Sequence, residues 1–174
     1  MIKFDKKLNV IDQMIIREAN TRDMPSVLRL IKELARFENE PEMVEVSVDD
    51  LINDGFKKNP AFKVYVAEAE ERIVGMALFY ERYSTWKGKA IHLEDLIVEE
   101  KFRGKGIGNA LYSEVLKYAY KFNFKRVAWE VLDWNTPAID FYESTGAKLL
   151  KDWRVVHMDE KSLSQFIQNI NQNN

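Results

Sequence analysis

The segment that decides the fold is residues 98–110, Val98-Glu99-Glu100-Lys101-Phe102-Arg103-Gly104-Lys105-Gly106-Ile107-Gly108-Asn109-Ala110. An apolar run at 90–98 precedes it, and apolar residues at helical spacing follow it up to about residue 122. The pattern therefore predicts a strand, a glycine loop and a helix. Alternate glycines permit positive φ, and a helix N-terminus attracts anions. Because Arg103 and Lys105 add two cations, the loop is predicted to hold a pyrophosphate.

Other glycine loops compete for the same residues. A nucleotide triphosphatase loop needs Gly-x-x-x-x-Gly-Lys-Ser/Thr, which is absent, because Asn109 follows Gly108. A dinucleotide-binding loop needs its third glycine where Asn109 stands, and it usually follows the first strand of its domain. Glu130 lies near the distance expected for a ribose-binding acid, so a dinucleotide site stays an alternative. The second alternative is a tight strand-to-helix turn that requires glycine and binds no ligand.

Along the rest of the chain, stretches with the helical spacing of apolar residues exchange with stretches that alternate as strands do. This pattern predicts one α/β (α+β) domain. We expect an N-terminal extension over 1–13, the domain over 14–168 and a frayed polar tail over 169–174. Asp23 and Pro25 predict a helix start, as do Ser47 and Asn135. The helices are expected over 24–37, 47–55, 107–122 and 136–146, with a short one near the C-terminus. The strands are expected over 14–17, 63–68, 73–83, 90–98, 126–131, 147–151 and 153–158.

Composition excludes several function classes. A chain of 174 residues with 26 basic and 28 acidic side chains lacks the positive excess of a nucleic-acid-binding protein. Without cysteine there is no disulfide, thiolate metal site or cysteine nucleophile, and the cytoplasm is the expected location. No His or carboxylate cluster has metal-ligand spacing, so no metal is expected. No apolar run approaches the roughly 20 residues that span a bilayer, so no membrane partner is expected.

Residues 98–110 resemble the pyrophosphate loop of the GNAT superfamily of acetyl-CoA-dependent N-acetyltransferases, often written Arg/Gln-x-x-Gly-x-Gly/Ala. The resemblance runs from about residue 14 to 158. Four further segments look like the diamine (spermidine/spermine) acetyltransferase branch and, within it, most like the thialysine acetyltransferases. These segments are residues 29–35, 83–88, 93–95 and 131–135.

The resemblance implies a mixed, mostly antiparallel twisted sheet that is flanked by helices and splayed beside the glycine loop. Acetyl-CoA is then the co-substrate, and its pantetheine arm lies in the splay. Backbone groups of Leu96 and Val98 would bind that arm beside Ile97, with Asn135 on the opposite side. The pyrophosphate would lie on Arg103, Gly104, Lys105, Gly106, Ile107 and Gly108. The resemblance also implies a homodimer and a small-molecule amine substrate.

An amine must lose its proton before it attacks a thioester, so a base is required. Glu94 stands in an otherwise apolar strand. From the residues alone it is either a base, acting directly or through water, or a strand-end carboxylate facing solvent. The resemblance favours the base. Strand alternation predicts that Asp95 lies on the other face, as a structural residue or as part of the substrate entrance.

The departing thiolate needs a proton donor, and a tyrosine hydroxyl supplies one at neutral pH. Tyr142 is the candidate general acid, or else an aromatic of the core. The two histidines, His92 and His157, are interpreted as packed strand residues. Ser84 stands where polyamine-acetylating relatives often carry an acid, which favours a short amine over spermidine. Acidic and aromatic candidates for binding a cationic substrate are Glu38, Trp86, Glu130, Asp133 and Trp153.

The leading interpretation is an N-acetyltransferase that works by direct attack in a ternary complex, because no cysteine is available to carry an acetyl group. The alternative is a non-catalytic sensor that binds acyl-CoA or an amine. A weaker alternative is a dinucleotide-binding oxidoreductase.

Overall fold

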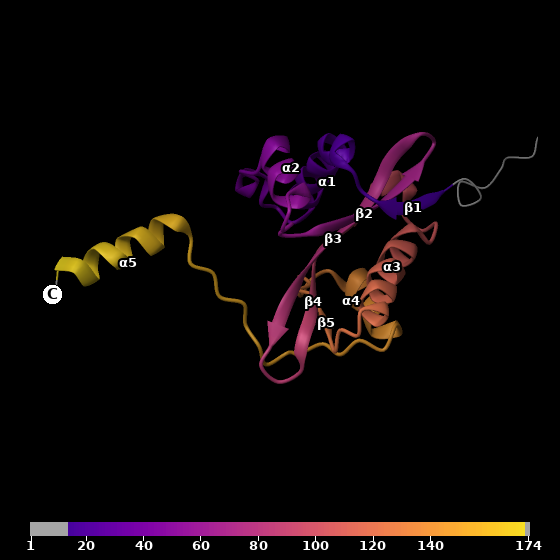
Figure 1. The fold of residues 1–174 in the computed structure, drawn as a ribbon. Helices are drawn as coiled ribbons and strands as arrows, with labels where there is room; N and C mark the ends of the chain where they lie inside the picture. Colours follow the sequence, from indigo (N-terminus) through magenta and orange to yellow (C-terminus); the bar gives the residue numbers. More distant parts are fainter. Residues whose placement is uncertain (1–13, 173–174) are drawn as a thin grey trace, which may run out of the picture. The chain divides into compact units, whose positions relative to one another are not determined.

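The structure, a computed structural model, describes residues 14–172 (Figure 1). It comprises two units, one up to Leu132 and one from Asp133, and each is described by itself. The predicted extension 1–13 and the last two residues of the predicted tail lie outside the described residues.

The first unit is built on an open five-stranded sheet with the order β1-β2-β3-β4-β5. Neighbouring strands pair antiparallel, except that β5 runs parallel to β4, so the mixed, mostly antiparallel sheet is confirmed. Its strands are β1 (Ile15–Glu18), β2 (Lys63–Ala69), β3 (Arg72–Ser84), β4 (Gly88–Val98) and β5 (Val127–Ala128). Its helices are α1 (Met24–Phe37), α2 (Val48–Phe56) and α3 (Ile107–Lys121), with 3₁₀ turns at Thr21–Asp23, Pro41–Met43 and Glu100–Phe102.

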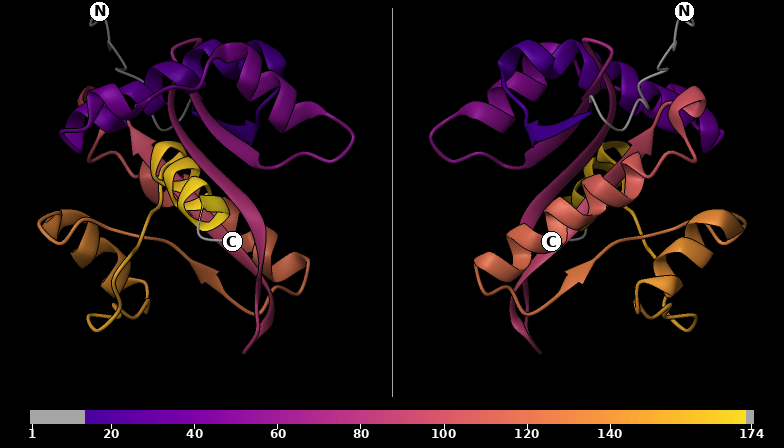
Figure 2. Two further views of the ribbon diagram at one scale, coloured as in Figure 1. Left: turned by 90° about the vertical axis from the view of Figure 1, so that its left-hand side faces the viewer. Right: turned by 90° about the vertical axis from the view of Figure 1, so that its right-hand side faces the viewer.

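Both faces of the central strands are buried, which explains why their sequences are nearly continuous apolar runs. On one face, Val64 and Val66 of β2 join the core formed with α1 and α2. On the other face Tyr65 stacks on Phe79 with ring centroids 5.4 Å apart, and Phe79 meets Tyr118 of α3 edge-on at 5.1 Å. The two views of Figure 2 show α3 running along the sheet. Strand alternation thus assigns α1 and α3 to opposite faces.

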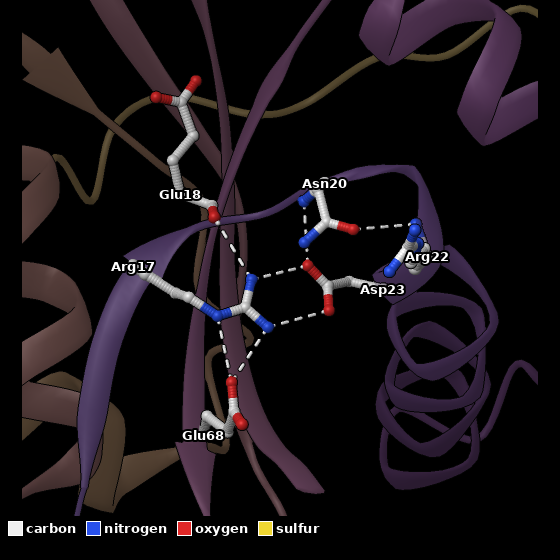
Figure 3. Close-up of polar contacts among 6 residues, drawn as sticks. All are labelled: Arg17, Glu18, Asn20, Arg22, Asp23 and Glu68. Carbon is white, nitrogen blue, oxygen red and sulfur yellow. Dashed lines mark hydrogen bonds and ion pairs between the residues drawn. The ribbon is translucent and has the colours of Figure 1, made fainter.

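The starts of two helices differ in how they are capped. Ser47 caps α2 as predicted, and its hydroxyl accepts a hydrogen bond from the Asp50 N–H at 3.1 Å. Asp23 stands at the N-cap of α1 but makes no capping hydrogen bond. Its carboxylate instead accepts two hydrogen bonds from Arg17, at 2.7 and 2.9 Å, and Arg17 also contacts Glu68 at 2.9 Å (Figure 3). We call Arg17, Asp23 and Glu68 the Arg17 cluster; it joins β1, β2 and the start of α1.

The second unit contains the helices α4 (Thr136–Ser144) and α5 (Glu160–Gln172). The strands predicted over 147–151 and 153–158 are wrong, because these residues form no strand in the described part of the chain. An apolar stretch becomes a strand only where a neighbouring strand accepts its backbone hydrogen bonds, and sequence pattern does not specify that neighbour. The predicted strand 126–131 is likewise shorter, at two residues. Residues 169–172 of the predicted polar tail belong to α5.

Candidate active site

A β-bulge interrupts β4 at Glu94. Leu93 pairs with Phe79 of β3 and Asp95 pairs with Leu78, so two neighbouring residues of β3 face three of β4. Glu94 is the extra residue and has no register partner. A bulge bends its strand and redirects side chains. The strict alternation from which Asp95 was assigned to the opposite face therefore does not hold at this position.

The bulge also changes which side of β4 each backbone group faces. The Ile91 N–H donates toward β5, to the Arg126 carbonyl at 2.9 Å, whereas the Glu99 N–H donates toward β3, to Val74 at 2.9 Å. Residues eight apart in a regular strand would face the same side, and the single extra residue reverses this parity. By the same count, Leu96 and Val98 direct their backbone groups away from β3.

No described strand covers β4 on that side beyond its first half. β5 pairs with β4 only at Ile91 and His92, so residues 93–98 have no ladder partner there within residues 14–172. The expected splay between the strand before the loop and the next strand is present. It leaves an open backbone edge beside the bulge.

Three carboxylates lie near one another at this bulge: Glu38 at the end of α1, and Glu94 and Asp95 of β4. Burial, and then the negative charges of Glu94 and Glu38, raise the pKa of Asp95 to about 7. Partial burial also raises the pKa of Glu38. None of the three forms an ion pair with Lys or Arg within the described residues of the first unit. We call them the carboxylate cluster.

Glu94 has two polar neighbours from the sheet. The His92 Nε2 lies 3.4 Å from the Glu94 Oε2, and Tyr80 hydrogen-bonds the same carboxylate. Burial, and then the charge of Glu94 and its hydrogen bond, raise the pKa of Tyr80, with a smaller contribution from Glu130. Tyr80 was not predicted as a site residue, because nothing in the strand pattern distinguishes it from a packing aromatic. His92 was predicted to serve packing alone.

The glycine loop has the shape of an anion cradle. Gly104 and Gly106 adopt positive φ, 73° and 79°, and a Cβ at either position would meet no atom within 4 Å. Gly106 is the N-cap of α3 and has no side chain to accept from the first-turn N–H groups. Gly108 differs from these two, because its φ is not positive and a Cβ there would make an ordinary contact, 3.8 Å from Val98 Cγ2. Open space, a helix N-terminus and two cations fit a pyrophosphate.

Contacts within the first unit hold this loop in place. The Arg103 Nε donates to the Val98 carbonyl at 2.9 Å, and the Lys105 Nζ lies 4.9 Å from the ring of buried Phe102. The buried Glu99 carboxylate, at the base of the loop, binds Arg29 at 2.7 Å and also Arg72. These ion pairs tie the loop to α1 and β3. These ion pairs were not predicted, because the partners are distant in sequence.

The remaining predicted site residues are distributed over both units. Trp86 lies in the turn between β3 and β4 and is 75% exposed. In the second unit, Asn135 caps α4 by accepting from the Ala138 N–H at 3.4 Å, and Tyr142 of α4 lies 5.2 Å from the Phe141 ring. Asp133 and Trp153 also belong to that unit, outside its helices.

No three His, Cys, Asp or Glu side chains in residues 14–172 are placed to hold a metal ion. In the same part of the chain, no helix combines the length and apolar character needed to cross a membrane.

Comparison with known proteins identifies the family. Residues 24–147 match the acetyltransferase (GNAT) family. The chain belongs to this family. It is therefore an acetyl-transferring enzyme, and the oxidoreductase alternative is not borne out.

Two relatives support the resemblance to the diamine acetyltransferase branch. The chain is 38% identical over 164 residues to the thialysine N-epsilon-acetyltransferase of Bos taurus, covering 88% of this chain and 96% of that protein. It is 34% identical to the spermidine/spermine N(1)-acetyltransferase-like protein 1 of Homo sapiens, covering 87% of this chain and 23% of that protein. An aminoglycoside N-acetyltransferase solved with CoA has the same fold, with a TM-score of 0.67 at 19% identity over 85% of this chain and 95% of that one.

Proposed function

We propose that this enzyme transfers the acetyl group of acetyl-CoA to a primary amine of a small basic molecule by direct attack in a ternary complex. The substrate class is a thialysine- or lysine-like amino acid or a short diamine. The observation that carries the proposal is the carboxylate cluster beside the open edge of β4, which pairs with no Lys or Arg of the described first unit. Such a cluster attracts a cationic amine and can accept its proton.

The residues of the loop and the strand fit the co-substrate. Gly104 and Gly106 leave room for its pyrophosphate at the start of α3, and Arg103 and Lys105 balance the charge. The backbone groups of Leu96 and Val98, with Ile97 between them, are available to the pantetheine amides. The Val98 carbonyl accepts a hydrogen bond from the Arg103 Nε at 2.9 Å, so we assign the contact with the pantetheine to its N–H. Acetyl-CoA, when bound, supplies an activated thioester, and we assign Asn135 to its opposite side.

The carboxylates perform the first proton transfer. An alkylammonium group has a pKa of about 10.4, so only about a thousandth of it is neutral near pH 7.4. Glu94 takes the proton from the amine, directly or through a water, and the nitrogen lone pair then attacks the thioester carbon. The charge of Glu94 helps to raise the pKa of Asp95 to about 7, so Asp95 is a second proton-accepting group near neutral pH.

Tyr142 performs the second proton transfer. As the carbon–sulfur bond breaks, its hydroxyl protonates the departing thiolate, and the second proton lost by the attacking nitrogen restores the hydroxyl. The first proton, held by Glu94, is released to solvent, so the products are the amide, the free thiol and one proton. Tyr142→Phe should lower kcat by about 10²–10⁴-fold and leave the affinity for CoA unchanged. Unchanged kcat under conditions where chemistry limits the rate would remove Tyr142 from this role.

We assign recognition of the cationic substrate to Glu38, Trp86, Glu130, Asp133 and Trp153. The first three lie in the first unit, and both Glu38 and Glu130 act electrostatically on residues of the bulge region. Ser84, two residues before Trp86, offers no charge to a second ammonium group. Burying that ammonium without a partner costs free energy, so long polycations lose more than short amines.

The test is a turnover assay with acetyl-CoA, read by thiol release, that compares kcat/KM for thialysine, 1,3-diaminopropane and spermidine. We expect the two short amines to be preferred. A clear preference for spermidine would overturn the substrate class. Acetyl-CoA binding without turnover on any of a wide panel of amines would instead favour the sensor alternative.

We further propose that the enzyme is a cytoplasmic homodimer. The absence of cysteine suits a reducing compartment, and α5 carries Leu163, Phe166 and Ile167 at the spacing of a single apolar stripe. Sedimentation at micromolar concentration should give twice the mass of one chain, and a monomer would contradict the dimer. Imaging of a fluorescent fusion tests the location.

A further inference from the structure

The side chains of Arg82, His92 and Glu94 form a chain of polar contacts along one side of the bulge. The Arg82 Nη1 lies 3.1 Å from the His92 Nδ1, and the His92 Nε2 lies 3.4 Å from the Glu94 Oε2. Arg82 and His92 sit on neighbouring strands, and the ring of His92 also lies 5.1 Å from that of Tyr80. His92 is 8% exposed, whereas the Glu94 side chain is 51% exposed.

The chemistry of the first contact fixes the state of the imidazole. A guanidinium group has five N–H donors, no acceptor, and does not lose its proton in proteins. The Nδ1 of His92 must therefore accept, so its lone pair is occupied and the ring is neutral with its hydrogen on Nε2. That N–H is the polar group of His92 nearest to the Glu94 carboxylate, with Nε2 3.4 Å from Oε2. An imidazolium would place a second donor against the guanidinium at 3.1 Å and lose this bond.

The backbone explains why Glu94 needs such support. His92 is held on both sides, by Tyr80 of β3 and by Ala128 of β5, and it is the last residue of β4 that pairs with both strands. Glu94 is the bulge residue and has no register partner. An exposed, unpaired side chain samples several rotamers, and ordering it costs free energy.

We propose that His92, held by Arg82 as the neutral Nε2–H tautomer, is a positioning residue that orients the Glu94 carboxylate for proton transfer from the amine. This inference rests on the proposed role of Glu94. His92 itself exchanges no proton with the substrate. Catalysis depends on sub-ångström placement of the base, so loss of the contact should lower kcat while acetyl-CoA still binds normally.

The tautomer is tested without substrate. In protein labelled with ¹⁵N-histidine, long-range ¹H–¹⁵N correlation spectra report the state of each ring, and His92→Gln assigns the two histidines. We expect His92 to be the neutral Nε2–H form at pH 7.5. An imidazolium or an Nδ1–H tautomer would overturn the proposal whatever the enzyme's substrate proves to be, and so separates its failure from that of the proposed function.

The positioning role is tested with variants that differ in hydrogen-bonding ability. His92→Phe keeps a ring in the core but has no donor, and we expect kcat to fall about 10-fold with the KM for acetyl-CoA and the melting temperature little changed. His92→Gln places an amide N–H near the former Nε2 and should recover most of kcat. His157→Gln is the matched control. Wild-type kcat in His92→Phe, or no recovery with Gln, would contradict the proposal.

A double-mutant cycle covers the case in which His92→Phe folds poorly. Arg82 is exposed, so Arg82→Met should fold, and it should lower kcat in the same direction as His92→Phe. Because Arg82 acts only through His92, the double variant should be no slower than His92→Phe alone. Additive effects would show that Arg82 acts by another route and would overturn the chain of contacts.

Discussion

The Arg17 cluster and the carboxylate cluster both contain acidic side chains of the first unit, but their carboxylates differ in pairing and in the direction of their pKa shifts. In the first, Arg17 binds Asp23 through two hydrogen bonds and Glu68 through a further contact, and the pKa of Asp23 is lowered chiefly by the hydrogen bond from Arg17 (Figure 3). In the second, no arginine or lysine of the described first unit pairs with the carboxylates, and the pKa of Asp95 is raised to about 7.

This difference distinguishes charged residues that stabilise the fold from charged residues that can take part in a reaction. A paired carboxylate is satisfied and fixes the geometry of the fold, whereas an unpaired, partly buried one costs stability and is ready to accept a proton or a cation. A cavity of about 340 Å³ lies beside the Arg17 cluster, yet the arginines that line it are bound to acidic residues. Its size alone therefore does not indicate a site.

The largest expected effect is on kcat, which should depend on the carboxylate cluster and not on the Arg17 cluster. Glu94→Gln removes the proposed proton acceptor and should lower kcat about 10²–10⁴-fold, with little change in the melting temperature. The matched control is Glu68→Gln, the same substitution in the Arg17 cluster, which should leave kcat unchanged. Comparable losses of kcat in both variants would mean that the two clusters do not differ in the way described.

The glycine loop provides the second test. Gly106→Val places a side chain in the open space of the loop and should weaken acetyl-CoA binding by more than about 10-fold, as measured by calorimetry. Gly88→Val is the control, because Gly88 also has positive φ, 86°, with nothing within 4 Å of a Cβ. Both variants bear similar backbone strain. Equal acetyl-CoA affinity in the two variants would exclude the loop as the binding site.

The Arg17 cluster should respond through stability. Asp23→Asn leaves Arg17 without its paired charge and should reduce the free energy of unfolding by about 2–3 kcal/mol at pH 7. Because the folded-state pKa of Asp23 is lowered, its contribution is full above the usual value of 3.8 and is lost as pH falls below it. Denaturant titrations at pH 7 and pH 3 should therefore show a smaller gap at pH 3 than at pH 7. A gap of equal size at both values would contradict the ion-pair explanation.

The carboxylate cluster should show the reverse pH dependence. The folded-state pKa of Asp95 lies above its usual value, so the wild type loses stability as pH rises from about 3.8 through about 7. Asp95→Asn removes this penalty and should stabilise the fold at pH 8 by on the order of 1–2 kcal/mol, with no gain at pH 4. The measurement is the melting temperature of both proteins at the two pH values. A variant less stable than the wild type at pH 8 would mean that Asp95 is satisfied in the fold.

The sequence predicted the parts of this molecule that depend on local pattern. The glycine loop before α3, the Ser47 cap and the strands of the sheet follow from residue type and spacing over a few positions. It did not predict the bulge at Glu94, because a register shift is decided by pairing with β3 and leaves no mark on the strand itself. The contacts of His92 and the carboxylate cluster depend on that bulge.

The strands predicted at 147–151 and 153–158 failed for a related reason. Their apolar residues favour a strand, but a strand forms only against a partner whose backbone is available. Asp23 is a further case in which a tertiary partner overrides a local pattern. Its position predicts a cap for α1, and Arg17, six residues earlier in the chain, takes its carboxylate instead.

The most direct test of the central claim is the pH dependence of kcat/KM in the wild type and in Asp95→Asn, with a short diamine as the amine. If the carboxylate cluster accepts the proton, the wild-type profile rises through an apparent pKa near 7, the pKa of Asp95, and this step is lost in the variant, which has no carboxylate at position 95. Asp23→Asn should keep the wild-type profile. A wild-type profile without a step between pH 6 and 8, or the same step retained in Asp95→Asn, would contradict the account.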